Sequence, residues 1–348
     1  MIQPTYAAAQ PAADRIYRLS AAQHATTLPD QQTLAALIDA AFWTSLRREE
    51  GYIPRISLAF VAPQHARQAV TFATSFSLDP GDLTKLGPAV ERTGLHLGVW
   101  PQQQELRVWG ITRNLPPFSL VLEVVLPGLL VVKQSPSEES GKFINIAVLQ
   151  GDEIKIIDPH AEVLRSESSI LLQLAVSMRA HGRGGTLLVV PAGSPTWAES
   201  ILQPITYSVV PSFPGLADLM RTQNKPTRRW EDALVRAVDG IAGLTAVDGA
   251  TLITADYELL AFGAKIVRRH GRPLVAQVMI TEPVVGRIPM IAEPAQLGGT
   301  RHLSAAQFVH DQPDAIALVA SQDGQFTVFA WPPSDERLQA HHIDVLLL

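Results

Sequence analysis

Closely spaced strand signals between residues 54 and 159 constrain the fold of this chain more than any other feature. Short runs rich in Val, Ile and Leu alternate there with turn residues, and two of them flank Gln102-Gln103-Gln104 as the arms of a hairpin. One helix, expected over residues 31–50 from apolar residues at helical spacing, precedes these strands. The pattern predicts an N-terminal α+β domain with a mostly antiparallel sheet over residues 28–160.

The second half of the chain follows a different pattern. Residues 186–190 form a continuous apolar run, which is typical of a central strand. Helical patterns lie before and after this run, the second of them over residues 230–244, and strand signals continue to residue 331. Because 348 residues exceed the usual size of one domain, we expect a second α/β domain over residues 161–335.

Two short terminal segments complete the expected plan. Residues 1–27 are rich in Ala, Gln and Pro and contain few large apolar residues, so we expect a flexible arm. Residues 336–348 are expected to form a C-terminal tail whose end docks onto a core or onto a second subunit.

Composition excludes several classes of function. The net charge of -5 argues against a nucleic-acid partner, because no basic excess is present to neutralise a phosphate backbone. The absence of cysteine excludes disulfides, thiol catalysis and Cys-ligated zinc. The most apolar stretch, residues 118–132, is interrupted by Glu123 and by Pro127-Gly128, and the N-terminus lacks a signal-peptide pattern. We therefore expect a cytoplasmic protein without a membrane partner.

One short stretch has the residues of an anion site. Gly298-Gly299-Thr300-Arg301-His302 precedes a helical pattern that ends near Val309. The N–H groups at a helix start attract negative charge, and Arg301 adds a cation beside them. The alternative is an ordinary loop in which Thr300 caps the helix and the two following side chains are solvated. About fifty residues upstream, Asp248-Gly249-Ala250 introduces a strand pattern.

The order of these motifs resembles the diadenylate cyclase (DAC) domain, which joins two ATP molecules into cyclic di-AMP. The resemblance covers residues 165–332 and includes Gly185-Thr186-Leu187-Leu188, Asp248-Gly249-Ala250, Gly299-Thr300-Arg301-His302 and Ser321-Gln322-Asp323-Gly324. The segment that begins Phe42-Trp43-Thr44 looks like the nucleotide-sensor branch of this superfamily, of the DACNV type. The resemblance implies a mixed central sheet flanked by helices.

The resemblance also implies a set of site residues. The residues expected to bind a nucleotide are Gly185, Thr186, Leu187, Asp248, Gly249, Ala250, Gly299, Thr300, Arg301, His302, Ser304 and Ser321. Asp248 and His302 would share a Mg²⁺ or Mn²⁺ ion that bridges phosphate oxygens, and the same two residues would be catalytic if the site is active.

One departure from the family pattern decides between binding and turnover. Leu303 stands where the DAC motif has a second arginine, and leucine can neither donate to a phosphate nor offset developing charge. We therefore expect a nucleotide sensor for ATP, a related nucleotide or a cyclic dinucleotide in bacterial defence signalling, without efficient turnover. An active diadenylate cyclase and a scaffold with a decayed pocket are the alternatives. A homo-oligomer and an effector protein are the expected macromolecular partners.

Overall fold

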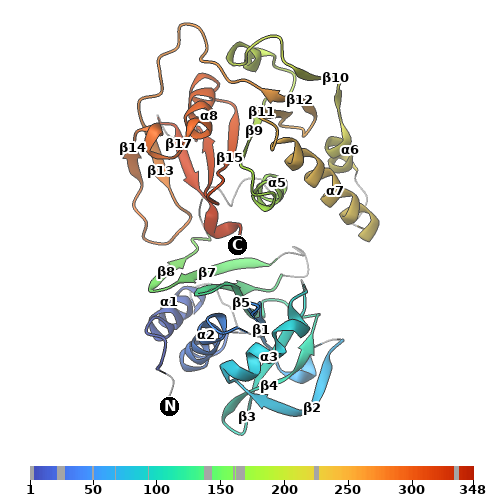
Figure 1. Ribbon diagram of the computed structural model, residues 1–348, viewed down its shortest axis with the longest axis vertical. Coiled ribbons are helices and arrows are strands. Elements are labelled where there is room, and N and C mark those ends of the chain that lie inside the picture. Colours follow the sequence, from blue (N-terminus) through green and yellow to red (C-terminus); the bar gives the residue numbers. More distant parts are fainter. Residues whose placement is uncertain are drawn as a thin grey trace. The chain divides into compact units, whose positions relative to one another are not determined.

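The computed structural model describes residues 4–21, 28–48, 51–66, 68–92, 94–136, 143–159, 161, 169–222, 227–332 and 337–348. The chain divides into two compact units (Figure 1). Unit 1 comprises residues 1–158 with Leu348, and unit 2 comprises residues 159–347. Both are mixed α/β, as the sequence predicts.

Unit 1 is built on one sheet with the strand order β2-β4-β3-β1-β5-β6-β7-β8. Its helices and strands are α1 (Ala9–Ala21), α2 (Gln31–Ser45), β1 (Ser57–Phe60), β2 (Val70–Ser77), α3 (Pro80–Val90), β3 (His96–Gln102), β4 (Glu105–Thr112), β5 (Leu120–Leu126), β6 (Leu129–Gln134), β7 (Ile144–Gln150) and β8 (Glu153–Ile156). Among the described pairs only β1 with β3 is parallel. The predicted mostly antiparallel sheet is present.

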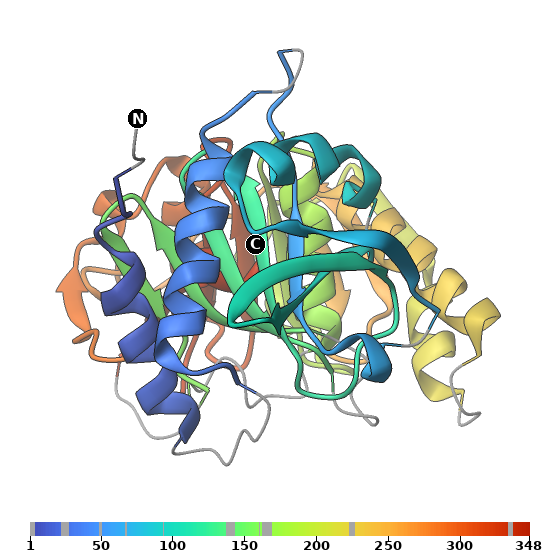
Figure 2. The ribbon, with the colours of Figure 1, turned by 90° about the horizontal axis from the view of Figure 1, so that it is seen from below.

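Helix α1 corrects the expectation of a flexible arm. Ala12, Ala13 and Ile16 are fully buried in the core of unit 1, on one face of the helix. Figure 2 shows α1 and α2 side by side over the sheet of this unit. The small alanines allow close helix packing, and Ala has the highest helix propensity of all residues. The rest of the expected arm, residues 22–27, lies outside the described residues.

Unit 2 contains a second mixed sheet with the order β10-β12-β11-β9-β15-β16-β17-β13-β14. Its elements are α5 (Ser169–Ala180), β9 (Gly185–Val190), β10 (Tyr207–Phe213), α6 (Gly215–Arg221), α7 (Arg228–Leu244), β11 (Ala250–Thr254), β12 (Leu259–Ala264), β13 (Val278–Thr281), β14 (Met290–Ala292), α8 (Thr300–Asp311), β15 (Ile316–Ala320), β16 (Phe326–Ala330) and β17 (Gln339–His342).

Strand β9 lies at the centre of this unit and is buried along its whole length. Its side chains alternate between two apolar clusters, because successive residues of a strand point to opposite faces. Leu188 packs in one cluster with Phe308 of α8. Leu187 packs in the other with Leu174 of α5 and Val238 of α7. Helices therefore cover both faces of the sheet, and α5 and α7 lie side by side (Figure 1).

The C-terminal segment also differs from expectation. Residues 339–342 form β17, which pairs with β16 and β13 inside the sheet of unit 2, so they are part of this unit rather than a tail. The predicted boundary between residues 335 and 336 lies outside the described residues. In the part of the chain that the structure describes, no helix is long and apolar enough to cross a membrane.

Candidate functional site

The strand register of unit 2 brings distant parts of the chain to one edge of the sheet. Ala250 of β11 pairs with Thr186 of β9, and Ala264 of β12 pairs with Ala250. On the other side of β9, Val319 of β15 also pairs with Thr186. Because β15 and β12 run antiparallel to their neighbours, their carboxyl ends meet the amino ends of β9 and β11. The residues that flank these strand ends therefore face one another.

Helix α8 begins at the same place. Gly299, rather than Thr300, is its N-cap, and no side chain hydrogen-bonds the first turn. The first N–H groups of a helix have no acceptor within the helix, and those of Thr300 and Arg301 are open to a ligand. The N–H of His302 instead donates to the backbone oxygen of Gly299, at 3.0 Å. The partial positive charge of the open N–H groups favours an anion at this point.

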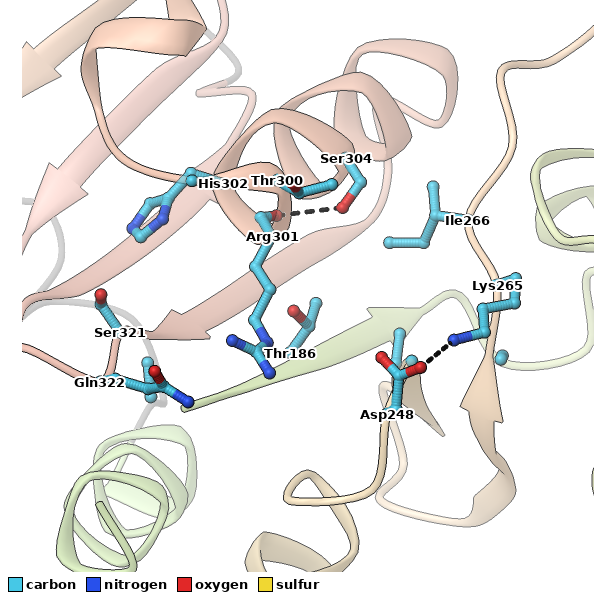
Figure 3. A pocket seen from close by; sticks show the side chains of 15 residues that line it. Thr186, Asp248, Lys265, Ile266, Thr300, Arg301, His302, Ser304, Ser321 and Gln322 are labelled. Atoms are coloured by element: carbon cyan, nitrogen blue, oxygen red, sulfur yellow. Dashed lines mark hydrogen bonds and ion pairs between the residues drawn. The ribbon is translucent and has the colours of Figure 1, made fainter. Parts of the chain in front are cut away.

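A cavity of about 500 Å³ lies between these elements (Figure 3). It is lined by Thr186, Asp248, Gly249, Ala250, Ala264, Lys265, Ile266, Gly299, Thr300, Arg301, His302, Ser304, Ala320, Ser321 and Gln322. All but two of the residues predicted for the site are in this set, although they come from four separate stretches of sequence. Its volume lies within the range of about 300–1,000 Å³ that is usual for small-molecule sites.

Gly249 is required by the close approach of two backbones at the cavity wall. Its φ is +114°, and a Cβ atom built on it would lie 2.5 Å from the carbonyl carbon of Gly263 and 2.8 Å from the carbonyl oxygen of Ala264. These neighbours are backbone atoms, which cannot rotate away. The glycine therefore lets Asp248 stand directly beside the end of β12.

Asp248 forms an ion pair that the sequence analysis did not anticipate. Its Oδ2 atom lies 2.5 Å from the Nζ atom of Lys265, which directly follows β12. The hydrogen bond from Lys265, and then the charge of that residue, lower the pKa of Asp248 below its ordinary value. Arg301 lowers it further. Asp248 is therefore a carboxylate at neutral pH, and the ammonium group of Lys265 compensates its charge.

Arg301 is the cation placed to meet a ligand. Its side chain extends from the first turn of α8 across the cavity, toward Thr186 and Gln322 (Figure 3). Within the described residues its guanidinium group forms no ion pair and no hydrogen bond with another side chain. The Gln322 amide instead donates to the backbone oxygen of Arg183. Arg301 thus retains its full donor capacity for a bound anion.

His302 has a different environment from Arg301. Only 2% of its surface is exposed, and its ring lies edge-on to Phe329 with 6.3 Å between ring centroids. Burial, followed by the charge of His342, lowers the pKa of His302, so the imidazole is neutral. Its Nε2 atom has no hydrogen-bond partner among the described residues. A Cβ at Gly298 would come within 2.6 Å of its Nδ1 atom, which explains the glycine before the N-cap.

Asp248 and His302 do not fit the metal site that the resemblance implies. The Asp248 side chain is 91% exposed and bonded to Lys265, whereas the His302 ring is turned away from it into the protein (Figure 3). No group of three or more His, Cys, Asp or Glu side chains suited to a metal ion is present in the described ranges. Mg²⁺ at nucleotide sites is commonly held by one or two protein carboxylates together with waters and phosphate oxygens. Asp248 is the one carboxylate among the described lining residues, and it is already paired with Lys265.

Two predicted site residues lie outside the cavity. Gly185 packs against the C-cap of α7, since a Cβ there would meet the backbone oxygen of Thr245 at 2.6 Å. Leu187 is fully buried in the cluster beneath α5 and α7. Leu303 does not line the cavity either, and 44% of its surface is exposed.

Sequence reasoning missed five residues that line the cavity, namely Ala264, Lys265, Ile266, Ala320 and Gln322. Lys265 and Ile266 follow β12, in a stretch without a motif. The signal that could have found them is the pairing of two consecutive strands, because a hairpin from Ala250 to Ala264 returns the chain to Asp248.

Comparisons with known proteins add one family match and one structural neighbour. Residues 23–113 match the family model described as "Probable sensor domain DACNV". A search of the curated proteins finds no match. Among solved structures, the chain is similar to a double mutant of DacA from Staphylococcus aureus, with 16% identity and a TM-score of 0.24, over 49% of this chain and 83% of that one.

The family match lies within unit 1, whereas the cavity lies in unit 2. It includes the Phe42-Trp43-Thr44 segment on which the sequence analysis based the sensor branch. The predicted resemblance to the DACNV-type sensors is therefore confirmed, and the chain is DACNV-like over residues 23–113.

Proposed function

We propose that the chain is a sensor that binds a phosphorylated nucleotide in the cavity of unit 2. The observation that carries this proposal is the position of Arg301, whose guanidinium group faces the cavity without a partner among the described residues, beside the open first turn of α8. Cations and helix N–H groups that converge on one cavity suit phosphate oxygens.

The remaining lining residues suit the other parts of a nucleotide. Thr186, Ser304 and Ser321 carry hydroxyl groups, which donate to or accept from a ribose or a phosphate. Ala264 and Ile266 give the wall near Lys265 an apolar surface against which a base can pack. ATP, a related nucleotide and a cyclic dinucleotide all share this combination of phosphate, sugar and base.

Binding rather than turnover is supported by two features of the site. The position of the second motif arginine is taken by Leu303, which is exposed on α8 and outside the cavity. Loss of one electrostatic donor commonly lowers a rate by about 10²–10³. In addition, the Asp248 carboxylate is paired with Lys265. Occupancy would act by favouring one conformational state, read by an effector protein or by a second copy of the chain.

Isothermal titration calorimetry of the full chain tests the proposal. ATP, ADP and cyclic di-AMP are titrated with Mg²⁺, with Mn²⁺ and with EDTA. At least one of the nucleotides is expected to bind with a stoichiometry of one per cavity or one per pair of cavities. Absence of binding by all of them, in a sample with a cooperative unfolding transition, would overturn the proposal.

An active diadenylate cyclase is the second candidate, because Asp248, Arg301 and His302 are retained in the family order and all line the cavity. Incubation with ATP and Mn²⁺, followed by chromatography, distinguishes the two. Cyclic di-AMP that disappears in Asp248→Ala would establish the cyclase. Nucleotide binding without formation of cyclic di-AMP, in the wild type and in Leu303→Arg, supports the sensor.

A further inference from the structure

The fold holds the backbone in place at both residues of the ion pair, Lys265 and Asp248. Ala250 and Ala264 pair in the β11–β12 hairpin, which brings Asp248 and Lys265 to the same sheet edge. The backbone oxygen of Lys265 accepts a hydrogen bond from the N–H of Leu202, at 2.8 Å. The next residue, Ile266, forms an isolated β-bridge with Ile201. The ammonium group thus extends from an anchored backbone into the cavity (Figure 3).

Stability of the fold does not account for this pair. The side chains of Lys265 and Asp248 are 53% and 91% exposed. Ion pairs between exposed side chains contribute little to folding, because water and salt screen them. Its location at the cavity, rather than the protein interior, indicates a role in what the cavity binds.

The charges of the cavity differ from those of a metal site. Asp248 is the one carboxylate among the described lining residues, and Lys265 and Arg301 are the cations. The protein groups therefore have a net charge of +1 before a ligand enters. A divalent cation at Asp248 would have to displace the ammonium group or share the carboxylate with it, and its other ligands would be waters and phosphate oxygens.

We propose that the Lys265 ammonium group takes the charge role of the divalent cation, so that the cavity binds its phosphorylated ligand without a metal ion. Lys265 and Arg301 contact the phosphate oxygens from opposite sides, and Asp248 orients Lys265. This inference rests on the proposed nucleotide binding and assigns Lys265 as a further binding residue. An ammonium group neutralises phosphate charge but cannot coordinate two phosphate oxygens in the fixed geometry of Mg²⁺, which agrees with binding in place of phosphoryl transfer.

Metal dependence of binding is the test. Calorimetry of the full chain uses ATP, ADP and cyclic di-AMP, and inorganic pyrophosphate as a probe without a base, each in EDTA and in Mg²⁺. The wild type is expected to bind in EDTA within about twofold of its affinity in Mg²⁺. The affinity of Lys265→Gln in EDTA is expected to be at least about tenfold lower than that of the wild type, because one charge-assisted hydrogen bond is lost. In Mg²⁺ the variant should recover part of this affinity, because Asp248 is then free to bind the metal ion. Lys265→Arg should retain metal-free binding.

The control is Lys155→Gln, which removes a partly buried lysine paired with Glu153 at 3.7 Å in unit 1. Its affinity should equal that of the wild type. Binding by the wild type only in Mg²⁺, or unchanged affinity of Lys265→Gln in EDTA, overturns the inference and leaves nucleotide binding in place. No binding of ATP, ADP or cyclic di-AMP under either condition, with metal-free pyrophosphate binding that depends on Lys265, overturns the nucleotide assignment and supports the role of Lys265. Absence of binding by all three nucleotides and by pyrophosphate overturns both.

Discussion

Ala250 pairs in register with Thr186 across the parallel ladder between β11 and β9. This pairing places Asp248-Gly249, just before β11, beside the start of β9. On the other side of β9, Val319 of β15 also pairs with Thr186. Segments more than a hundred residues apart thereby line one cavity. Four predictions concern this site and the stability of the two units.

Gly249→Ala should destabilise unit 2 by about 1–3 kcal/mol or more, because the residue has φ of +114° and the new Cβ would collide with the backbone of Gly263. Thermal and urea unfolding of the full chain measure the change. Gly271→Ala is the matched control, since Gly271 also has a positive φ of +78° but has open space around it. Equal effects of the two substitutions would show that the close approach to Gly263 is absent.

Ile16→Ala should cost about 2–5 kcal/mol of unit 1 stability, because the side chain is fully buried in the core formed by α1, α2 and the sheet. Tyr17→Ala removes a larger side chain that is 40% exposed, and should have a smaller effect. Hydrogen exchange over residues 31–45 reports on α2, the neighbour of α1. Unchanged hydrogen exchange in Ile16→Ala would contradict the packing of α1 in the core and favour the flexible arm expected from composition.

Stability should fall as the pH is lowered from 6.5 toward 4, because burial lowers the pKa of His341 from 6.5 to about 4. The unfolded chain takes up a proton in this window and the folded chain does not. The stabilisation is therefore complete above pH 6.5 and is lost as the pH falls, by about 3 kcal/mol at most. The lowered pKa of His302 acts in the same direction.

His341→Gln isolates this contribution. Glutamine retains a group for the hydroxyl of Thr281, which lies 2.6 Å from Nδ1 of His341, but it does not titrate. Urea unfolding at several pH values should show a shallower loss of stability for His341→Gln than for the wild type. Parallel pH profiles for wild type and His341→Gln would contradict the assignment.

The sequence predicted the parts of the fold that depend on local pattern. The strands of unit 1 and the continuous apolar run of β9 were recognisable because burial imposes an alternating or unbroken apolar pattern. Helix α1 was not, because alanine occurs both in loose segments and at close helix contacts, and only packing distinguishes them. Strand β17, with the sequence Gln-Ala-His-His, has little β propensity and is formed by its two neighbours.

The same distinction between local pattern and tertiary contact applies to the residues of the candidate site. Motif order anticipated the positions of Asp248, Thr186 and Arg301, because each stands at the start of a recognisable element. Lys265 could not be anticipated, because its place depends on the register of β11 with β12. The direction of the His302 ring likewise depends on tertiary contacts with Phe329 and Gly298 rather than on spacing.

Calorimetric titration of Arg301→Gln against the wild type tests nucleotide binding in this cavity most directly. The nucleotide is the one that binds the wild type most tightly, and Arg236→Gln, which removes an exposed arginine of α7, is the control. Arg301→Gln is expected to bind at least about tenfold more weakly, with an unchanged unfolding transition, because the guanidinium group has no partner to lose among the described residues. Affinity equal to that of the wild type would contradict the account and favour a scaffold whose cavity binds no nucleotide.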